Sequence, residues 1–151
     1  YEVSPSWASL LMSLMTLGAA SGSLTVTYLV KTFGEKRTTI DLSIIMGILV
    51  FVLYASGLQW VSIGVLLPWT YVAGAGFVSG DTLTLDQVPD YRGTLMSLNT
   101  VARNLGMTIG AMLGGGLLLF YGYGVFGLVM GVLGLSAAII YYSLTNEVRS
   151  P

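Results

Sequence analysis

Long apolar stretches occupy most of this 151-residue chain, and the gaps between them that carry positive charge alternate with gaps that carry none. A bilayer core about 30 Å thick needs roughly 20 residues of helix to cross it. Charged residues make up only 9% of the chain and its mean hydropathy is +0.81, whereas a soluble domain carries about 25% charged residues. The pattern predicts an all-α integral membrane protein.

We predict a bundle of five transmembrane helices in one transmembrane domain, because a segment in lipid must satisfy its backbone polar groups internally. The approximate helix bounds are 6–31, 39–57, 61–84, 90–120 and 123–145. Barrel strands would be about 10 residues long with alternating polarity, and runs such as 44–55 do not alternate. The second helix is apolar almost throughout, which suggests a lipid-facing position.

Five of the six Lys and Arg residues fall in gaps on one side of this expected bundle. These five are Lys31, Lys36, Arg37, Arg92 and Arg149. The positive-inside rule places that side in the cytoplasm. The chain is therefore expected to lie in the cell membrane (plasma or inner), with the bilayer as its surroundings, its N-terminal end outside and its C-terminal end in the cytoplasm.

Several kinds of chemistry have no support in the composition. The sequence has no Cys and no His, which excludes disulfides, thiol catalysis and Cys/His metal sites. It contains no phosphate-binding loop, and its net charge of −1 gives no indication of a nucleic-acid partner. An intramembrane aspartyl protease needs two facing aspartates at depth, and only Asp81 is eligible. We expect no enzyme activity, no metal and no cofactor.

The fourth predicted helix carries glycines at every fourth residue, Gly106, Gly110 and Gly114. At 3.6 residues per turn, Asn99 and Arg103 share a narrow stripe with the first two of them. Glycines at this spacing let another helix approach closely, and packing drives helix association in lipid. The stripe therefore predicts a helix-packing face that also carries a charge.

Alternative interpretations stay open for three side chains. Arg103 lies eleven residues, or ~16 Å of helix, beyond Arg92, where it would contact an anionic substrate, pair with a proton-carrying acid, or serve as a structural charge. Asp81 is either a coupling acid or a carboxylate at the headgroup level, and its place in the last turns of the third helix favours the headgroup. Trp69, beside Pro68, either lines an aromatic substrate cavity or packs.

The first basic loop resembles a loop of the major facilitator superfamily. In each six-helix half of that family, the loop between the second and third helices reads roughly Asp-Arg-x-Gly-Arg-Arg-Arg/Lys. Residues 31–37 keep Gly34, Lys36 and Arg37 of this pattern and depart from it at positions 31, 32 and 35.

A second loop adds to the resemblance. Arg92 and Gly93 match the end of the family pattern Pro-x-x-x-Arg-Gly, with one spacer residue fewer after Pro89. The glycine-rich helix that follows is similar to the penultimate helix of multidrug and small-solute antiporters in the same family.

The resemblance implies that the chain is a partial C-terminal transmembrane domain, the last five of twelve helices. The missing partner would then be the N-terminal half of the same transporter, consistent with a first residue, Tyr1, that is not methionine. The implied function is a secondary transporter that moves a small solute by alternating access, with proton-coupled export as the leading form. The alternative is a self-contained five-helix scaffold or assembly subunit.

Overall fold

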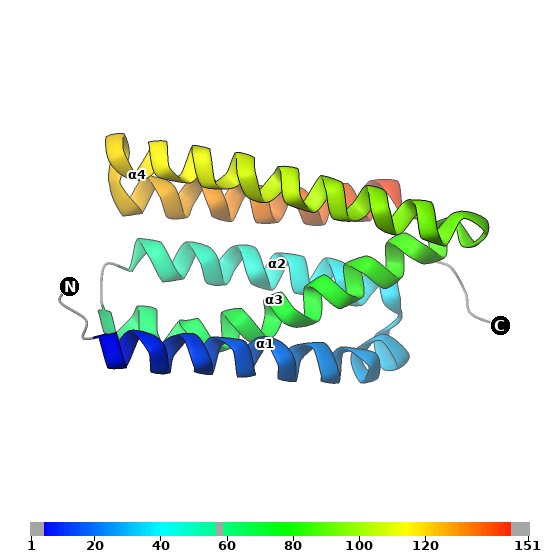
Figure 1. Cartoon of the computed structure of the whole chain (residues 1–151), viewed down its shortest axis with the longest axis horizontal. Helices are drawn as coiled ribbons and strands as arrows, with labels where there is room; N and C mark the ends of the chain where they lie inside the picture. Colours follow the sequence, from blue (N-terminus) through cyan, green and yellow to red (C-terminus); the bar gives the residue numbers. More distant parts are fainter. Residues whose placement is uncertain (1–4, 57–58, 146–151) are drawn as a thin grey trace.

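A computed structural model describes residues 5–56 and 59–145 of the chain (Figure 1). Four helices in these ranges are long and apolar enough to cross a membrane. They are α1 (Pro5–Phe33), α2 (Glu35–Ala55), α3 (Gln59–Gln87) and α4 (Arg92–Leu144), with a short 3-10 turn, η1 (Pro89–Tyr91), before α4. The predicted all-α membrane class is confirmed. The predicted tail with Arg149 and the last residue of the predicted helix 39–57 lie outside the described residues.

The helix α4 contains both of the last two predicted helices. Gly122 within it has a φ of 76° and a ψ of −177°, which is not helical, and Figure 1 shows the chain doubling back there. We call 92–121 the first arm and 123–144 the second arm. The five predicted membrane segments are therefore accounted for by four helices, because Gly122 reverses the chain within α4 without a separate loop.

A single glycine also joins α1 to α2. Gly34 has a φ of 84°, a conformation that residues with a Cβ rarely adopt, and its N–H donates to the carbonyl of Val30 at 2.9 Å. As a result α2 begins at Glu35, four residues before the predicted start. The basic segment is therefore mostly helical: Lys31 lies in the last turn of α1, and Lys36 and Arg37 lie in the first turn of α2.

Backbone contact at glycines holds α1 against α3. A Cβ at Gly22 would lie 2.0 Å from the carbonyl oxygen of Tyr71, and a Cβ at Gly74 would lie 2.1 Å from that of Ala19. The Ser23 hydroxyl crosses the same contact and donates to the Gly74 carbonyl at 3.2 Å. Only residues without a side chain permit this approach, which maximises packing where the lipid offers no hydrophobic driving force.

The helix α2 lies at the centre of the bundle, between α3 and α4 (Figure 1). On one side Gly47 meets the second arm, where a Cβ at Gly134 would lie 2.8 Å from the Gly47 Cα. On the other side the buried hydroxyls of Thr39 and Ser79 are hydrogen-bonded at 2.6 Å. The prediction that this helix faces lipid is too broad: two of its faces are packed, and it stays a prediction for the exposed strip that includes Ile45 and Ile48.

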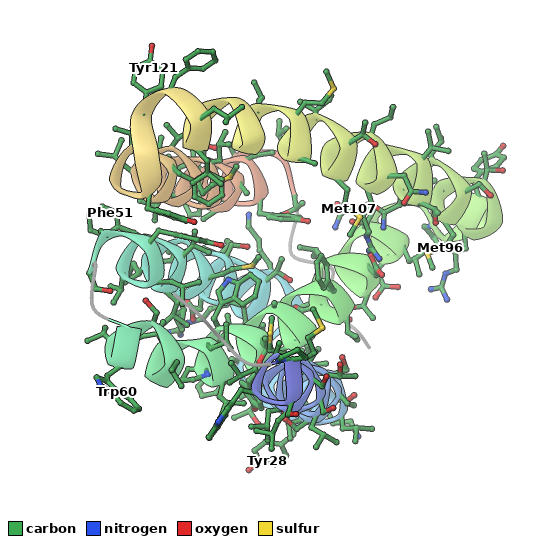
Figure 2. All side chains as sticks on the ribbon, turned by 60° about the vertical axis from the view of Figure 1, so that its left-hand side comes forward. Tyr28, Phe51, Trp60, Met96, Met107 and Tyr121 are labelled. Carbon is green, nitrogen blue, oxygen red and sulfur yellow. The ribbon has the colours of Figure 1, made fainter. Side chains whose placement is uncertain are left out.

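The first arm of α4 leaves much of its surface uncovered by the described residues. A Cβ at Gly106 or Gly110 would meet nothing within 4 Å, whereas one at Gly114 would lie 3.0 Å from the Phe126 ring of the second arm. Figure 2 shows Met107 on this arm, and its side chain is 61% exposed. That Gly106 and Gly110 admit another helix stays a prediction.

The two ends of the bundle differ in chemistry. Figure 2 shows Trp60 and Tyr121 at one end and Met96 toward the other. Both aromatic side chains are exposed, as is typical of residues at a membrane–water interface. The connection at Gly34 and the turn η1 lie together at the opposite end (Figure 1), so the structure gathers the basic residues of both connections at one end.

The glycine contact between α1 and α3 predicts a large difference between two alanine substitutions. Gly22→Ala should lower the free energy of unfolding by about 1–3 kcal/mol relative to Gly64→Ala, because overpacking against backbone cannot relax. Gly64 is a matched control within a helix, since a Cβ there meets nothing within 4 Å and gains the same helix propensity. Unfolding in a denaturing detergent, followed by Trp fluorescence, measures both. Equal stability of the two variants would contradict the close contact.

The reversal in α4 predicts a second matched pair. Gly122→Ala should cost about 1–3 kcal/mol of stability, because the φ and ψ of Gly122 are open essentially to glycine alone. Gly124→Ala is the control: it lies two residues later in the second arm, where the structure records no positive φ and a Cβ meets nothing within 4 Å. The same unfolding assay applies, and a Gly122→Ala variant as stable as Gly124→Ala would argue against the hairpin geometry.

Candidate functional site

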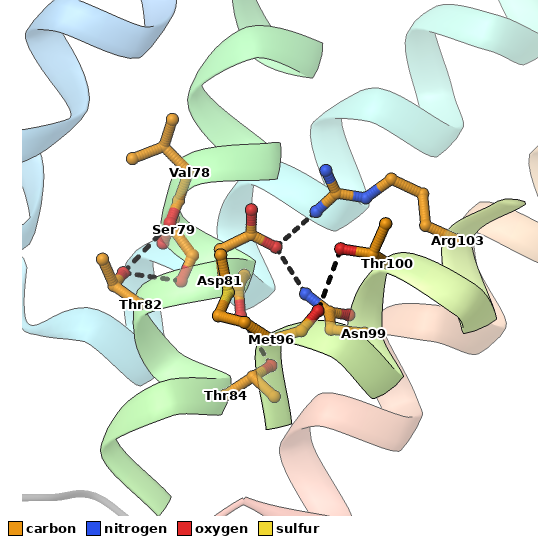
Figure 3. A network of polar contacts seen from close by, with 10 residues as sticks. Val78, Ser79, Asp81, Thr82, Thr84, Met96, Asn99, Thr100 and Arg103 are labelled. Carbon is orange, nitrogen blue, oxygen red and sulfur yellow. Dashed lines mark hydrogen bonds and ion pairs between the residues drawn. The ribbon is translucent and has the colours of Figure 1, made fainter. Parts of the chain in front are cut away.

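An acid, an amide and a guanidinium meet between α3 and the first arm of α4 (Figure 3). The Asn99 amide donates to Asp81 Oδ1 at 2.7 Å. The Arg103 guanidinium donates to the same oxygen in a short ion pair. Within the described residues, all hydrogen bonds to the Asp81 carboxylate end on Oδ1. We call Asp81, Asn99 and Arg103 the polar cluster.

Local helix geometry explains why these side chains converge. Asn99 and Arg103 are four residues apart and therefore project from one face of the first arm. Side chains in a helix lean toward its N-terminus, and the first arm begins at the basic end of the bundle, so Arg103 reaches back to the level of Asn99. Asp81 stands six residues before the end of α3 and meets both donors there.

The environment of the polar cluster is partly apolar. The Arg103 guanidinium carbon lies 5.2 Å from the centre of the Phe77 ring, which sits one turn before Asp81 on α3 and attracts a cation through its π face. From the second arm, the Tyr141 hydroxyl approaches Gly80, where a Cβ would lie only 3.1 Å from it. Three membrane segments therefore surround the acid.

Partial burial strengthens the ion pair between Asp81 and Arg103. Their side chains are 25% and 37% exposed, so water screens this pair less than it would screen a fully exposed one. The carboxylate offsets the charge of the arginine, and both donors end on one of its oxygens. The arrangement therefore holds a paired charge between two membrane segments.

Trp69, the remaining predicted site residue, lies elsewhere. It lines a separate cavity of about 360 Å³ between α2, α3 and the second arm, together with Tyr54 and Phe126. Its Nε1 is buried and has no hydrogen-bond partner within the part of the chain that the structure describes. Both interpretations of Trp69 remain open, and the structure does not bring it to the polar cluster.

The predicted loop residues form their own contacts at the basic end. Arg92 pairs with Asp86 at 3.1 Å across η1, and the Glu35 carboxyl lies close enough to Asp86 for their charges to interact. Lys36 Nζ donates to the carbonyl of Thr145 at 2.6 Å. A Cβ at Gly93 would meet nothing within 4 Å.

Sequence reasoning missed the neighbours of the polar cluster. Phe77 carries a detectable signal, because it precedes Asp81 by four residues and so shares its helix face. Tyr141 follows Asp81 by sixty residues, and nothing local marks it. Among the described residues, no group of three or more Asp, Glu, His or Cys side chains is placed to hold a metal ion.

The helices are long and apolar enough to cross a membrane, and the charged pair lies between two of their segments. Together these features define a polytopic membrane protein with a polar site between its helices. The sequence matches the Major Facilitator Superfamily over residues 1–151, and the chain belongs to that family. The family consists of transporters, so the chain is a transporter sequence of this superfamily. It matches no curated protein and no solved structure.

The ion pair of the polar cluster predicts strong coupling between its two charges. Asp81→Asn and Arg103→Met should each lower the free energy of unfolding by about 1–3 kcal/mol, because each leaves a partly buried charge unpaired. The double variant should cost less than the sum of the two. A double-mutant cycle in the unfolding assay measures this coupling.

The pair between Asp86 and Arg92 supplies the control for that cycle. Its side chains are 32% and 60% exposed, so Asp86→Asn with Arg92→Met should show a coupling below about 1 kcal/mol. Additive effects at Asp81 and Arg103, or a larger coupling at the control pair, would contradict the proposed strength of the ion pair.

Proposed function

We propose that this chain acts within a secondary transporter that exports a small solute in exchange for protons by alternating access. The observation that carries this proposal is the ion pair between Asp81 and Arg103 inside the helix bundle. Ionisable residues within membrane segments are costly and commonly serve ion or substrate pathways. We assign Asp81 as the proton carrier and Arg103 as its counter-ion, with Asn99 orienting the carboxylate.

The proposed coupling follows from the electrostatics of the polar cluster. When Asp81 is ionised, it holds Asn99 and Arg103 and so links α3 to the first arm. When a proton neutralises Asp81, the attraction to Arg103 falls and this link weakens. The helix α4 packs far more extensively on α2 than on α3, so the bonds to Asp81 are an important connection between α3 and the first arm.

The uncovered face of the first arm supports a further part of the proposal. Gly106 and Gly110 have open space beside them, and they share a stripe with Arg103. We propose that the other half of the same transporter covers this face, so that the solute passes between the two halves. We also propose that the basic end of the bundle faces the cytoplasm.

Neutralising the acid should separate proton coupling from solute binding. In the complete transporter in liposomes, Asp81→Asn should abolish uphill solute movement driven by a pH gradient and retain solute exchange at equal pH, because the variant mimics a permanently protonated acid. The assay follows proton release with a pH-sensitive dye while amphipathic probes such as ethidium are added. Asp86→Asn, which removes a carboxylate from the surface pair, should retain coupling.

Two outcomes would reject this assignment. Normal pH-driven transport by Asp81→Asn would show that the acid does not carry the proton. Loss of coupling in both variants to the same degree would assign the effect to surface charge and not to the polar cluster.

A further inference from the structure

An apolar groove runs along the outside of the bundle between α2 and the second arm of α4. It has a volume of about 460 Å³ and is lined by Ile40, Ile44, Leu135, Ala138, Ile139 and Tyr142. Ala138 is buried at its floor, whereas Ile139 and Tyr142 on its wall are 67% and 71% exposed. This groove lies away from the polar cluster, and the proposed transport mechanism does not use it.

Two cations stand at one end of this groove. Lys36 and Arg37 precede Ile40 by four and three residues, so all three share a face of α2. The Lys36 ammonium lies 5.4 Å from the centre of the Tyr142 ring and donates to the Thr145 carbonyl at 2.6 Å. The same tyrosine therefore lines the groove and contacts a cation.

The two cations at this end of the groove differ in their ion pairs. Arg37 pairs with Asp41 at 3.7 Å, but both side chains are largely exposed, at 71% and 57%, so water weakens the pair. None of the ion pairs between described residues involves Lys36. At the mouth of the groove, Lys36 therefore has no ion pair among the described residues, and Arg37 has one that water weakens.

The walls of the groove suit a flexible chain better than another helix. Where helices of this protein pack closely, they do so at glycines, as Gly22 does on α3 and Gly47 does on the second arm. The groove offers mostly branched and aromatic side chains at its surface, which keep a helix backbone at a distance. An acyl chain can follow the narrow space between them.

We propose that this groove binds one acyl chain of an anionic phospholipid, whose phosphate lies between Lys36 and Arg37. Clusters of basic residues beside a membrane segment attract anionic headgroups, and here the apolar groove continues directly from them. The site would hold a lipid from the leaflet at the basic end of the bundle.

Tryptophan quenching by brominated lipids tests this site directly. The native residues Trp7, Trp60 and Trp69 are replaced by Phe, and Tyr142→Trp becomes the only reporter, which keeps an aromatic face for Lys36. The purified protein is placed in phosphatidylcholine vesicles that contain either brominated phosphatidylglycerol or brominated phosphatidylcholine. Brominated phosphatidylglycerol should quench the reporter to the same degree as brominated phosphatidylcholine at an about fivefold lower mole fraction. This is the factor expected for one basic residue at an anionic surface.

Two charge variants distinguish a specific lipid site from a general attraction of anionic lipid to the basic end of the bundle. Arg37→Gln should remove most of the preference for phosphatidylglycerol. Lys31→Gln removes the same charge from the neighbouring end of α1, outside the groove, and should leave the preference unchanged. If Tyr142→Trp does not fold, Ile139→Trp reports from the same exposed wall.

Three results would overturn the proposal. Equal quenching by both lipids would mean that the headgroup is not selected. Equal loss of preference in Arg37→Gln and Lys31→Gln would mean that the basic end attracts anionic lipid without a site. An absence of quenching by either lipid would mean that protein covers the groove.

Discussion

The whole bundle depends on how closely two helix backbones can approach in an apolar medium. Lipid solvates leucine and isoleucine as well as a protein interior does, so helices gain little from burying such side chains against each other. This chain gains contact instead where side chains are missing, at Gly22 and Gly74 between α1 and α3 and at Gly47 and Gly134 between α2 and the second arm. Those two contacts fix the framework in which α3 and α4 present the polar cluster.

The polar cluster occupies the place where this close packing ends. The second arm is tightly held on α2, whereas the first arm leaves Gly106 and Gly110 uncovered and meets α3 at Asp81, Asn99 and Arg103. A hydrogen-bonded contact of this kind depends on the charge state of one carboxyl, and a glycine contact does not. The molecule therefore combines helix contacts made by backbone packing with one contact made by charge.

Features that depend on local sequence could be predicted. Segment length and apolar composition predicted the membrane class, and helical periodicity placed Asn99 on the same face as Arg103. Features that depend on distant residues could not. The pairing of Arg103 with Asp81 joins positions 22 residues apart, and the central position of α2 depends on helices whose apolar faces look alike in sequence. The breaks at Gly34 and Gly122 fall in predicted gaps between helices, but how tightly each glycine turns the chain depends on its backbone conformation, which the sequence does not show.

The ion pair also determines how the bundle experiences a membrane voltage. While Asp81 is ionised, it and Arg103 together carry no net charge, so a transmembrane potential exerts little net force on them. Without the negative charge of Asp81, Arg103 alone would carry one positive charge on the first arm. Moving a full elementary charge across the membrane is worth roughly 2.3 kcal/mol per 100 mV, and Arg103 would sense a part of this. Loss of one charge from the pair would thus make a neutral contact between two helices respond to voltage.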